Sequence, residues 1–465
     1  MARVRYHIDG GLSEDQLDML HGRALETLAS VGMEATNAGL LAFLAGRPGF
    51  RVEGQRVRFD RGLLEECVRE SRELGGPPPA DGSDWEVTVL SGYPTHVADW
   101  DAGGVRPMAV PDVVELTKLV DVLHDQGVRG STPGVPQDVP PEVRDILCYK
   151  IGAELCREGG VVNISSLDSA EWLWRMAEVL GHQRGLAVFV VNPLRAEGVT
   201  FDALYRFRDR LHAVGVGSMP MMALSAPVHV MGAFVISVAS VWGAWAMARE
   251  LTGKRHFGVE CRIWPVSMRS VDVVYGTPEM VFSDLVSTQL RTFYGWHSTE
   301  CDGFHSSANL CDHQAAAQRG AYGMVMALAG RRAFRFGGLL GVDLVFSPVQ
   351  LLLDLELVRY YRHVVEGFPF SEEALCMDAI RDVGPSGSFL GHESTLAAYR
   401  DVFFESARWT SEPLGRWLSD GARSFADRAK DEIAALIAQH EFRLPDDRAR
   451  EIERIYGEAE AVLLR

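Results

Sequence analysis

Basic residues are scarce in this sequence. It has 46 Lys and Arg against 63 Asp and Glu among 465 residues, a formal net charge of −17 at pH 7. Nucleic acids and anionic membranes are bound through clustered Lys and Arg side chains that displace counterions. We therefore expect neither a nucleic acid nor a membrane as a partner.

Cysteines are also few, and none lies in a CxxC pair. The seven are odd in number and scattered, which argues against a disulfide framework. The N-terminal MARVRYHIDGG lacks the apolar core of a signal peptide, so we expect a cytoplasmic protein. No GxGxxG or P-loop follows a predicted strand, and no GxSxG elbow or Ser-His-Asp order supports a hydrolase.

Long hydrophobic runs are absent except for one, from Ala226 to Ala248. Its length is close to that needed to cross a bilayer. No basic cluster marks a cytoplasmic flank and no second run of this kind occurs in the sequence. A helix that is apolar all round can equally be buried in a large soluble domain, and we favour that interpretation.

The pattern along the chain predicts an α/β protein with three regions. Residues 1–82 carry a helix that begins after Ser13 and a hairpin at Gly54-Gln55. Residues 83–370 alternate short apolar strands with helices, which fits an eightfold (β/α)8 TIM-type barrel. Residues 371–465 are mostly helical, and we expect them to pack on the barrel or on a second subunit of a homo-oligomer. The predicted strands are 161–166, 186–193, 214–225, 256–266, 292–304 and 331–341, with two more between residues 86 and 130.

Reactive side chains are concentrated from Tyr294 to His313, in the strand predicted at 292–304 and just beyond its C-terminal end. Catalytic groups of β/α barrels lie at the C-terminal ends of the strands, so this stretch is predicted to face a ligand. Its candidate residues are Tyr294, Trp296, His297, Glu300, Cys301, Asp302, Phe304, His305, Asn309, Cys311, Asp312 and His313.

Ten segments, each weak alone, occur in the order found in one family. They are Leu12–Glu34, Arg56–Phe59, Asp99–Pro107, Asn192–Arg195, Ser225–Glu250, Met268–Arg269, Gly276–Glu279, Cys311–Ala315, Ser347–Glu356 and Gly387–Leu390. Together they resemble the trimethylamine methyltransferase family of corrinoid-linked amine demethylases, over nearly the whole chain.

The resemblance implies a barrel that takes a methyl group from a methylated amine and passes it to the cobalt of a corrinoid. The sequence has no nonstandard residue, so it resembles the members without pyrrolysine, which include glycine betaine methyltransferases. A DxHxxG corrinoid-binding motif is absent, so the methylcorrinoid or cobalamin is expected on a separate corrinoid protein.

The sequence departs from the family pattern near the expected active site. By the resemblance, Asn309 replaces the family's Lys, Cys311 its Pro and Gln318 its Glu, while His229 replaces a Thr. Asn309 and Gln318 are therefore candidate substrate contacts, and the changes leave open whether the substrate or the reaction differs.

A quaternary ammonium has no N–H to donate, so ring faces and a carboxylate are expected to hold it. Trp264 and Trp296 are the predicted walls of such a box, with Tyr294 and Phe304 as further walls. The alternative for each ring is that it fills the core. The other candidates are Glu300 and Asp302 as counter-charge or catalytic groups, His297 and His229 as catalytic groups, and Arg269 as a clamp for a substrate carboxylate.

A zinc site is the alternative for the same stretch. Cys301, His305, Cys311 and His313 offer the thiolate and imidazole ligands that zinc prefers, although free cysteines are commonly buried as small hydrophobes. Three functions therefore stay open: a corrinoid-dependent methyltransferase for a small, quaternary amine, which we favour; a corrinoid-independent enzyme with a zinc or thiol site; and a noncatalytic betaine-binding protein.

Overall fold

The N-terminal region forms the helix and hairpin that the sequence predicts. The computed structural model describes residues 3–76, 85–99, 103–255 and 257–465. Ser13 caps α1 through a capping box with Gln16, and Gly54, with φ of +62°, lies in the hairpin turn. The elements are α1 (Glu14–Ser30), β2 (Met33–Ala35), α2 (Ala38–Leu44), β3 (Phe50–Glu53), β4 (Arg56–Phe59) and α3 (Arg61–Leu74).

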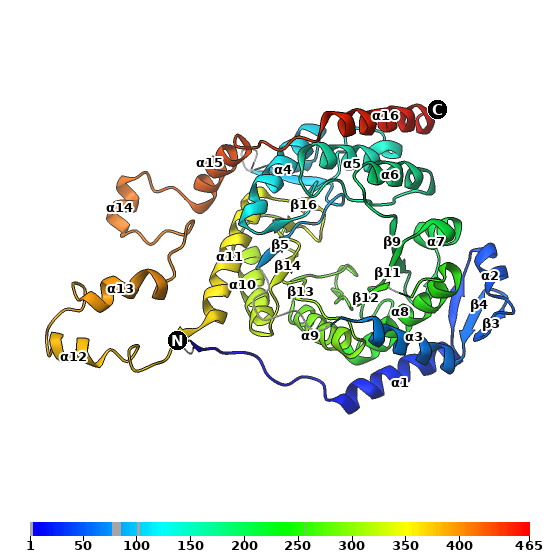
Figure 1. Ribbon diagram of the computed structural model, residues 1–465, viewed down its shortest axis with the longest axis horizontal. Helices are drawn as coiled ribbons and strands as arrows, with labels where there is room; N and C mark the ends of the chain where they lie inside the picture. The colour runs from blue at the N-terminus through cyan, green and yellow to red at the C-terminus, as the bar shows by residue number, and fades with distance from the viewer. Residues whose placement is uncertain (1–2, 77–84, 100–102, 256) are drawn as a thin grey trace.

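Two parallel sheets run through the middle of the molecule (Figure 1). One has the order β9-β11-β12 and the other β8-β5-β14-β13. Among the described residues the two sheets do not hydrogen-bond to each other, and the strand predicted at 161–166 is absent. The mixed α/β class is confirmed. The strands are β5 (Glu86–Thr88), β8 (Val128–Arg129), β9 (Gly185–Val190), β11 (Ala213–Ser218), β12 (Phe257–Cys261), β13 (Glu300–Cys301) and β14 (Ala333–Arg335).

Helices cover the outer sides of these strands (Figure 1). Each predicted strand from 186 onwards is shorter in the structure. The strands predicted at 186–193, 214–225 and 256–266 lose their C-terminal parts to loops, whereas the one predicted at 292–304 begins with the end of α9 and a loop and is a strand only at Glu300–Cys301. The covering helices are α4 (Val110–Leu123), α5 (Arg144–Leu155), α6 (Leu167–Val179), α7 (Val199–Phe207), α8 (Val230–Thr252), α9 (Pro278–Phe293), α10 (His313–Leu328) and α11 (Pro348–Glu366).

The long apolar run forms α8, which is a core helix in this fold. Within the described residues it is the one helix long and apolar enough to cross a membrane, yet 72% of its most hydrophobic window is buried. It packs against α1 and α3 on one side and β11 and β12 on another. Trp242 and Trp245 are fully buried in it. The predicted burial of this run is therefore confirmed.

Short strand pairings, both antiparallel and parallel, and the C-terminal helices complete the molecule. β6 and β7 pair antiparallel within the segment Asp99–Pro107 and the residues before it, and residues 100–102 between them lie outside the described residues. The strands are β1 (Arg3–Val4), β6 (His96–Asp99), β7 (Gly104–Pro107), β10 (Arg195–Ala196), β15 (Leu339–Leu340), β16 (Val345–Phe346) and β17 (Phe368–Pro369). The helices are α12 (Met377–Val383), α13 (Glu393–Val402), α14 (Leu414–Ser419), α15 (Phe425–Ile437) and α16 (Asp446–Leu463).

Candidate functional site

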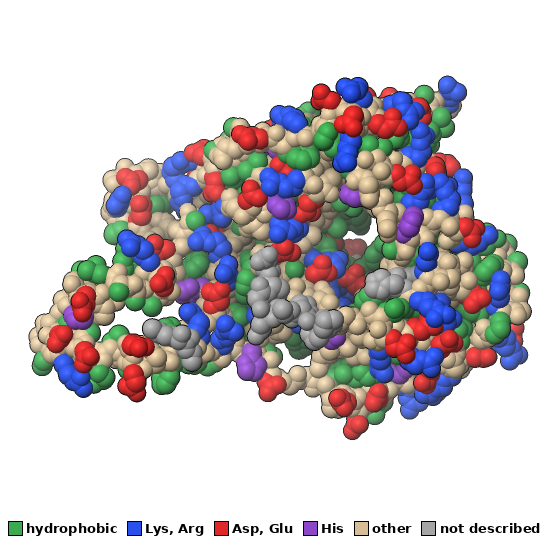
Figure 2. Space-filling view, in the orientation of Figure 1, with side chains coloured by type: hydrophobic (Ala, Val, Ile, Leu, Met, Phe, Trp, Pro, Cys, Tyr) green, Lys and Arg blue, Asp and Glu red, His purple; other side chains and the backbone are tan. Residues whose placement is uncertain are grey.

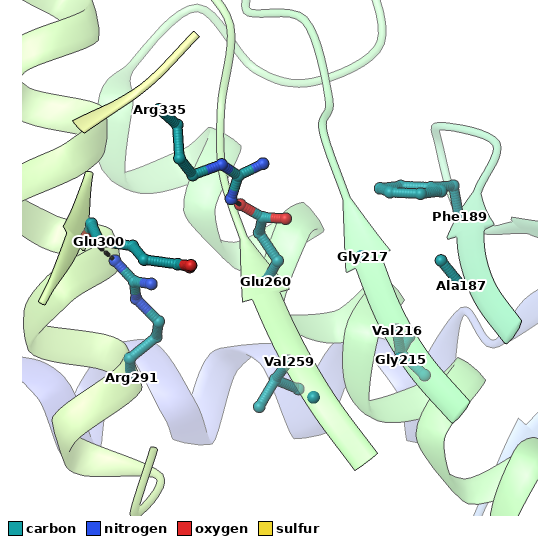
Figure 3. Close-up of a pocket in the computed structure, with 11 residues that line it drawn as sticks. Ala187, Phe189, Gly215, Val216, Gly217, Val259, Glu260, Arg291, Glu300 and Arg335 are labelled. Carbon is teal, nitrogen blue, oxygen red and sulfur yellow. Dashed lines mark hydrogen bonds and ion pairs between the residues drawn. The ribbon is translucent and has the colours of Figure 1, made fainter. Parts of the chain in front are cut away.

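A cavity of about 210 Å³ opens beside β9, β11 and β12 (Figure 3). Buried parallel strands are usually rich in Val, Ile and Leu, but here Gly215 and Gly258 lie at the wall, and a Cβ atom on either would meet no atom within 4 Å. Glycine therefore leaves space where side chains would otherwise fill it. The lining residues are Ala187, Phe189, Gly215, Val216, Gly217, Gly258, Val259, Glu260, Arg291, Glu300 and Arg335.

The polar part of this cavity wall combines two carboxylates with two guanidinium groups. Arg335 Nη1 donates to Glu260 Oε1 over 2.7 Å, and Arg291 Nη2 donates to the Glu300 carbonyl over 2.9 Å. In Figure 3 the Glu300 side chain extends into the space between these groups. Burial raises the pKa of Glu260, but the charges of Arg335 and then Arg262 outweigh it and hold the pKa well below its usual range. Glu260 is therefore a permanent anion at the cavity wall.

Arg262, two residues beyond Glu260, is the centre of a buried ion network. Its Nη1 donates to Asp284 Oδ1 over 2.7 Å and lies 2.6 Å from Asp302 Oδ2, while its Nε donates to Glu260 Oε1 over 2.5 Å. Burial raises the pKa of Asp302 to about 7, although Arg262 and Arg335 act in the opposite direction. Asp302 is thus held in an ion pair behind the cavity and titrates near neutral pH.

A cluster of aromatic rings surrounds His305. Its imidazole stacks on Tyr275, with ring centroids 4.2 Å apart and planes 5° apart, and the ring of Phe336 lies 3.7 Å away on centroids. Trp264 is 5.1 Å from the imidazole. Burial, reinforced by Arg262 and other arginines, lowers the pKa of His305 well below its usual value. The imidazole is therefore neutral.

Asp343 joins this cluster. Tyr275 Oη donates to Asp343 Oδ2 over 2.8 Å, and His305 Nε2 lies 3.5 Å from Asp343 Oδ1. Burial raises the pKa of Asp343 to about 6. Gln318, a predicted substrate contact, hydrogen-bonds to the backbone of this cluster. Its Nε2 donates to the Tyr275 carbonyl over 3.3 Å, and its Oε1 accepts from Ser306 Oγ over 2.7 Å.

The predicted aromatic box is not assembled. Trp264 lies in the His305 cluster, but Trp296 Nε1 donates to Ser71 Oγ over 2.6 Å and the indole packs against Trp245. Tyr294 is buried against Trp242 in the same core, and Phe304 is buried beside Phe334 and Tyr361. Three of the four rings therefore pack in the core and do not form a binding site, as the alternative interpretation of the sequence held.

The structure does not bring the predicted zinc ligands together. Cys301 is buried in β13, His305 lies among aromatic rings, Cys311 is half-buried and His313 is exposed at the start of α10. Burial raises the pKa of Cys301 well above its usual value and that of Cys311 to about 12. Nowhere in the described part of the chain do three His, Cys, Asp or Glu side chains gather as metal ligands.

Of the remaining predicted site residues, one lines the cavity and four lie elsewhere. Glu300 lines the cavity, whereas His229, Arg269 and Asn309 are exposed and His297 is half-buried. His229 precedes α8 without a hydrogen bond that caps the helix. None of the latter four lines the cavity described above.

Sequence reasoning missed Glu260, Arg262, Arg291 and Arg335. One signal could have found two of them, because Gly258, Glu260 and Arg262 are two residues apart in a predicted strand. Residues at this spacing point to the same face of a strand. Two charged groups after a glycine on one face of a buried strand indicate a polar interior.

Comparisons with known proteins agree with the resemblance seen in the sequence. A family model described as trimethylamine methyltransferase (MTTB) matches residues 6–456. The glycine betaine methyltransferase of Desulfitobacterium hafniense strain Y51 is 24% identical over 411 residues, which cover 84% of this chain and 85% of that protein. The trimethylamine methyltransferase MttB of D. hafniense strain DSM 10664 / DCB-2 is 23% identical over 482 residues, which cover 99% and 96%.

Solved structures match over most of the chain. One of them, the monomethylamine methyltransferase MtmB of Methanosarcina barkeri, has a TM-score of 0.46 and 13% sequence identity and covers 93% of this chain and 89% of that one. A likeness of this degree carries no argument about the site.

Proposed function

Because the chain belongs to the trimethylamine methyltransferase family, we propose that it is a methyltransferase that removes a methyl group from a small quaternary amine. The acceptor is the cobalt of a corrinoid on a separate protein, and the reaction takes place in the cytoplasm. The relatives' names, glycine betaine methyltransferase and trimethylamine methyltransferase, support the substrate class. The seven unpaired cysteines fit a reducing compartment.

The observation that carries the proposal is the glycine-walled cavity with Glu260 and Glu300 at its polar side. Its volume of about 210 Å³ is below that of typical pockets for drug-sized ligands, roughly 300–1,000 Å³, so it suits a small ligand. The charge of Glu260 is already paired with Arg335 and Arg262, so the Glu300 carboxylate and the ring of Phe189 are the lining groups that suit a cation without N–H groups. A corrin ring is far larger than this cavity, so the carrier would have to approach from outside.

The carrier's cobalt supplies the nucleophile that accepts the methyl group. The work left to this chain is to bind the amine, to hold one methyl group in line with the acceptor and to exclude water. Glu300 attracts the cationic nitrogen, while Gly215 and Gly258 leave room for the methyl groups. The electron pair of the broken C–N bond stays on nitrogen, so a quaternary substrate leaves as a neutral amine and needs no proton from the protein.

We also propose that the two parallel sheets are consecutive parts of one eightfold barrel wall. In chain order the strands are β5, β8, β9, β11, β12, β13 and β14, and β14 pairs with β5. The segment at 161–166 falls between β8 and β9, where an eighth strand would stand. The cavity then lies inside the barrel, and the region of residues 83–370 is the barrel domain.

The experiment is an anaerobic assay with cob(I)alamin and a panel of trimethylammonium compounds, followed by the absorbance change on conversion to methylcob(III)alamin. We expect conversion with one compound or a small related group. Glu300→Gln should raise KM by about tenfold, equivalent to about 1.4 kcal/mol, whereas the exposed Glu441→Gln should behave as the parent. Binding of a betaine without conversion would instead mark a noncatalytic betaine-binding protein, and no binding of any compound would refute both.

A further inference from the structure

The His305 cluster consists of four rings: His305, Trp264, Tyr275 and Phe336. It lies beyond the C-terminal ends of the strands, since Phe336 follows β14 directly and His305 follows β13. On β12, Glu260 lines the cavity, Arg262 belongs to the ion network and Trp264 reaches the cluster. The chain stays paired with the segment after β11 as far as Trp264, and residues two apart in such a chain point to the same side. The cluster therefore lies on the C-terminal side of the cavity.

These rings close the cavity on that side. His305 and the three rings that contact it are between 1% and 7% exposed. Arg335 links them to the cavity, because its guanidinium carbon lies 5.0 Å from the centre of the Phe336 ring and its Nη1 donates to Glu260 (Figure 3). The molecule is open elsewhere. Figure 2 shows a hollow with acidic side chains inside it, at the place where Figure 1 has β11 and β12, so a small amine can enter without passing the cluster.

The backbone of residues 336–343, which carries one of these rings, is strained. Phe336, Val342 and Asp343 have φ of +71°, +53° and +71°. This left-handed conformation is unfavourable for residues with a Cβ atom, and most of all for a β-branched residue such as valine. Such strain persists only where the surrounding packing holds it, and it is concentrated at active sites and in segments that switch conformation.

The imidazole of His305 is also poorly satisfied in the closed cluster. Among the described residues neither of its ring nitrogens has a hydrogen-bond partner, and the approach to Asp343 Oδ1 is 3.5 Å. A buried polar group without a partner is costly, because it has given up its hydrogen bonds to water. Opening of the cluster returns both nitrogens to water and releases the strained backbone, at the cost of the ring contacts with Tyr275 and Phe336. The closed state is therefore held by a small difference between opposing terms.

We propose that the His305 cluster is a gate between the cavity and the C-terminal ends of the strands, and that residues 336–343 are its moving part. In β/α barrels the chemistry takes place at this end, so it is the side from which a methyl acceptor reaches the bound amine. A corrinoid carrier that docks here favours the open state, and methyl transfer is thereby coupled to docking. This use of the gate rests on the proposed function, whereas its opening can be measured without it.

Amide hydrogen exchange of the full-length protein, without amine or corrinoid, tests whether the gate opens. The amide of Gly341 donates to the Ala308 carbonyl over 2.8 Å, so the segment that carries His305 and the moving segment are joined. We expect residues 303–308 and 336–343 to exchange together, through an opening at least about tenfold more frequent than the one that exposes α8. Exchange of both segments only at the rate of α8 would overturn the gate.

Val342→Gly should make this opening about fivefold rarer, because glycine adopts positive φ freely and the closed state loses its strain. The matched control is Val271→Gly. Val271 is also a valine at positive φ, +60°, but it is 56% exposed and lies outside the cluster, so exchange of the two segments should stay as in the parent. Equal effects of the two substitutions, or no effect of Val342→Gly, would contradict the moving segment.

His305→Phe gives a second measurement. It keeps a ring between Tyr275 and Phe336 but removes the buried nitrogens, so it should also make opening rarer. In the assay with cob(I)alamin we expect a lower kcat for this variant and for Val342→Gly, with unchanged affinity for the amine in calorimetry. Transfer at the parent rate in both variants would overturn the role of the gate in transfer. Opening of the gate in a protein that demethylates none of the compounds would refute the proposed function and leave the gate standing.

Discussion

Replacement of Arg262 by Met should destabilise the protein more than the loss of any exposed ion pair. Arg262 is 2% exposed and is within 2.7 Å of carboxylate oxygens from Glu260, Asp284 and Asp302. The substitution keeps an unbranched side chain but leaves three acidic groups without their shared cation. Removing one partner of a buried ion pair costs about 3–5 kcal/mol, since the remaining charge is buried without compensation.

Urea unfolding followed by tryptophan fluorescence would measure this loss. The matched control is Arg23→Met, which removes an ion pair with Glu26 between side chains that are 67% and 61% exposed. Such a pair contributes about 0–1 kcal/mol, so the two variants should differ clearly at the same pH. If Arg262→Met lowered the free energy of unfolding by no more than Arg23→Met, the network would not be the stabilising unit inferred from its geometry.

Three further predictions concern pH, the cavity and the core. Burial raises the pKa of folded Asp302 from 3.8 to about 7, so its proton favours the folded state and the free energy of unfolding should fall as pH rises from about 4 to 7. Asp302→Asn should lack this contribution. If the free energies of unfolding of the parent and the variant changed with pH in parallel, the raised pKa of Asp302 would be refuted. Gly215→Val should abolish amine turnover yet change the free energy of unfolding by only about 1 kcal/mol. The control is Gly185→Val, where the added side chain also enters open space but lies outside the cavity, and this variant should keep its turnover. Equal turnover in the two variants would contradict the cavity as the active site. Gly243→Ala should lower the free energy of unfolding by about 1–3 kcal/mol, because its Cβ would collide with Met33 Sδ. Gly457→Ala, at an exposed position of α16, should raise the free energy of unfolding by up to about 1 kcal/mol, and thermal unfolding distinguishes the two signs.

The helices and the N-terminal hairpin were predictable because their signals are local. The Ser cap at Ser13 placed the start of α1, and Gly54-Gln55 placed the turn between β3 and β4. Strand lengths were not predictable in the same way. The chain from Pro220 to Ser225 continues the apolar pattern of β11, yet it forms a loop held by Ser225 Oγ, which accepts from the Met221 amide over 2.8 Å. Long-range packing therefore decided where each strand ended.

The candidate site was predicted less well than the fold. Grouping Tyr294 to His313 by sequence proximity joined residues that point to different places, since Tyr294 and Trp296 enter the core with α8 while Glu300 lines the cavity. Arg262 and Arg335 were missed because a charged residue in a predicted strand indicates a buried polar site only when the groups that pair with it are known. The partner of Arg335 is Glu260, which is 75 residues away along the chain.

The burial of α8 also bears on how this protein is made. A run of 23 residues that is apolar enough to cross a membrane is also the kind of segment that the targeting machinery at the ribosome recognises. Its cover on one side, α1 and α3, precedes it in the chain and has left the ribosome when α8 emerges. Because α1 and α3 are made before α8, one side of its packing surface is present as soon as α8 emerges, and the apolar run need not stay exposed until the rest of the fold is complete.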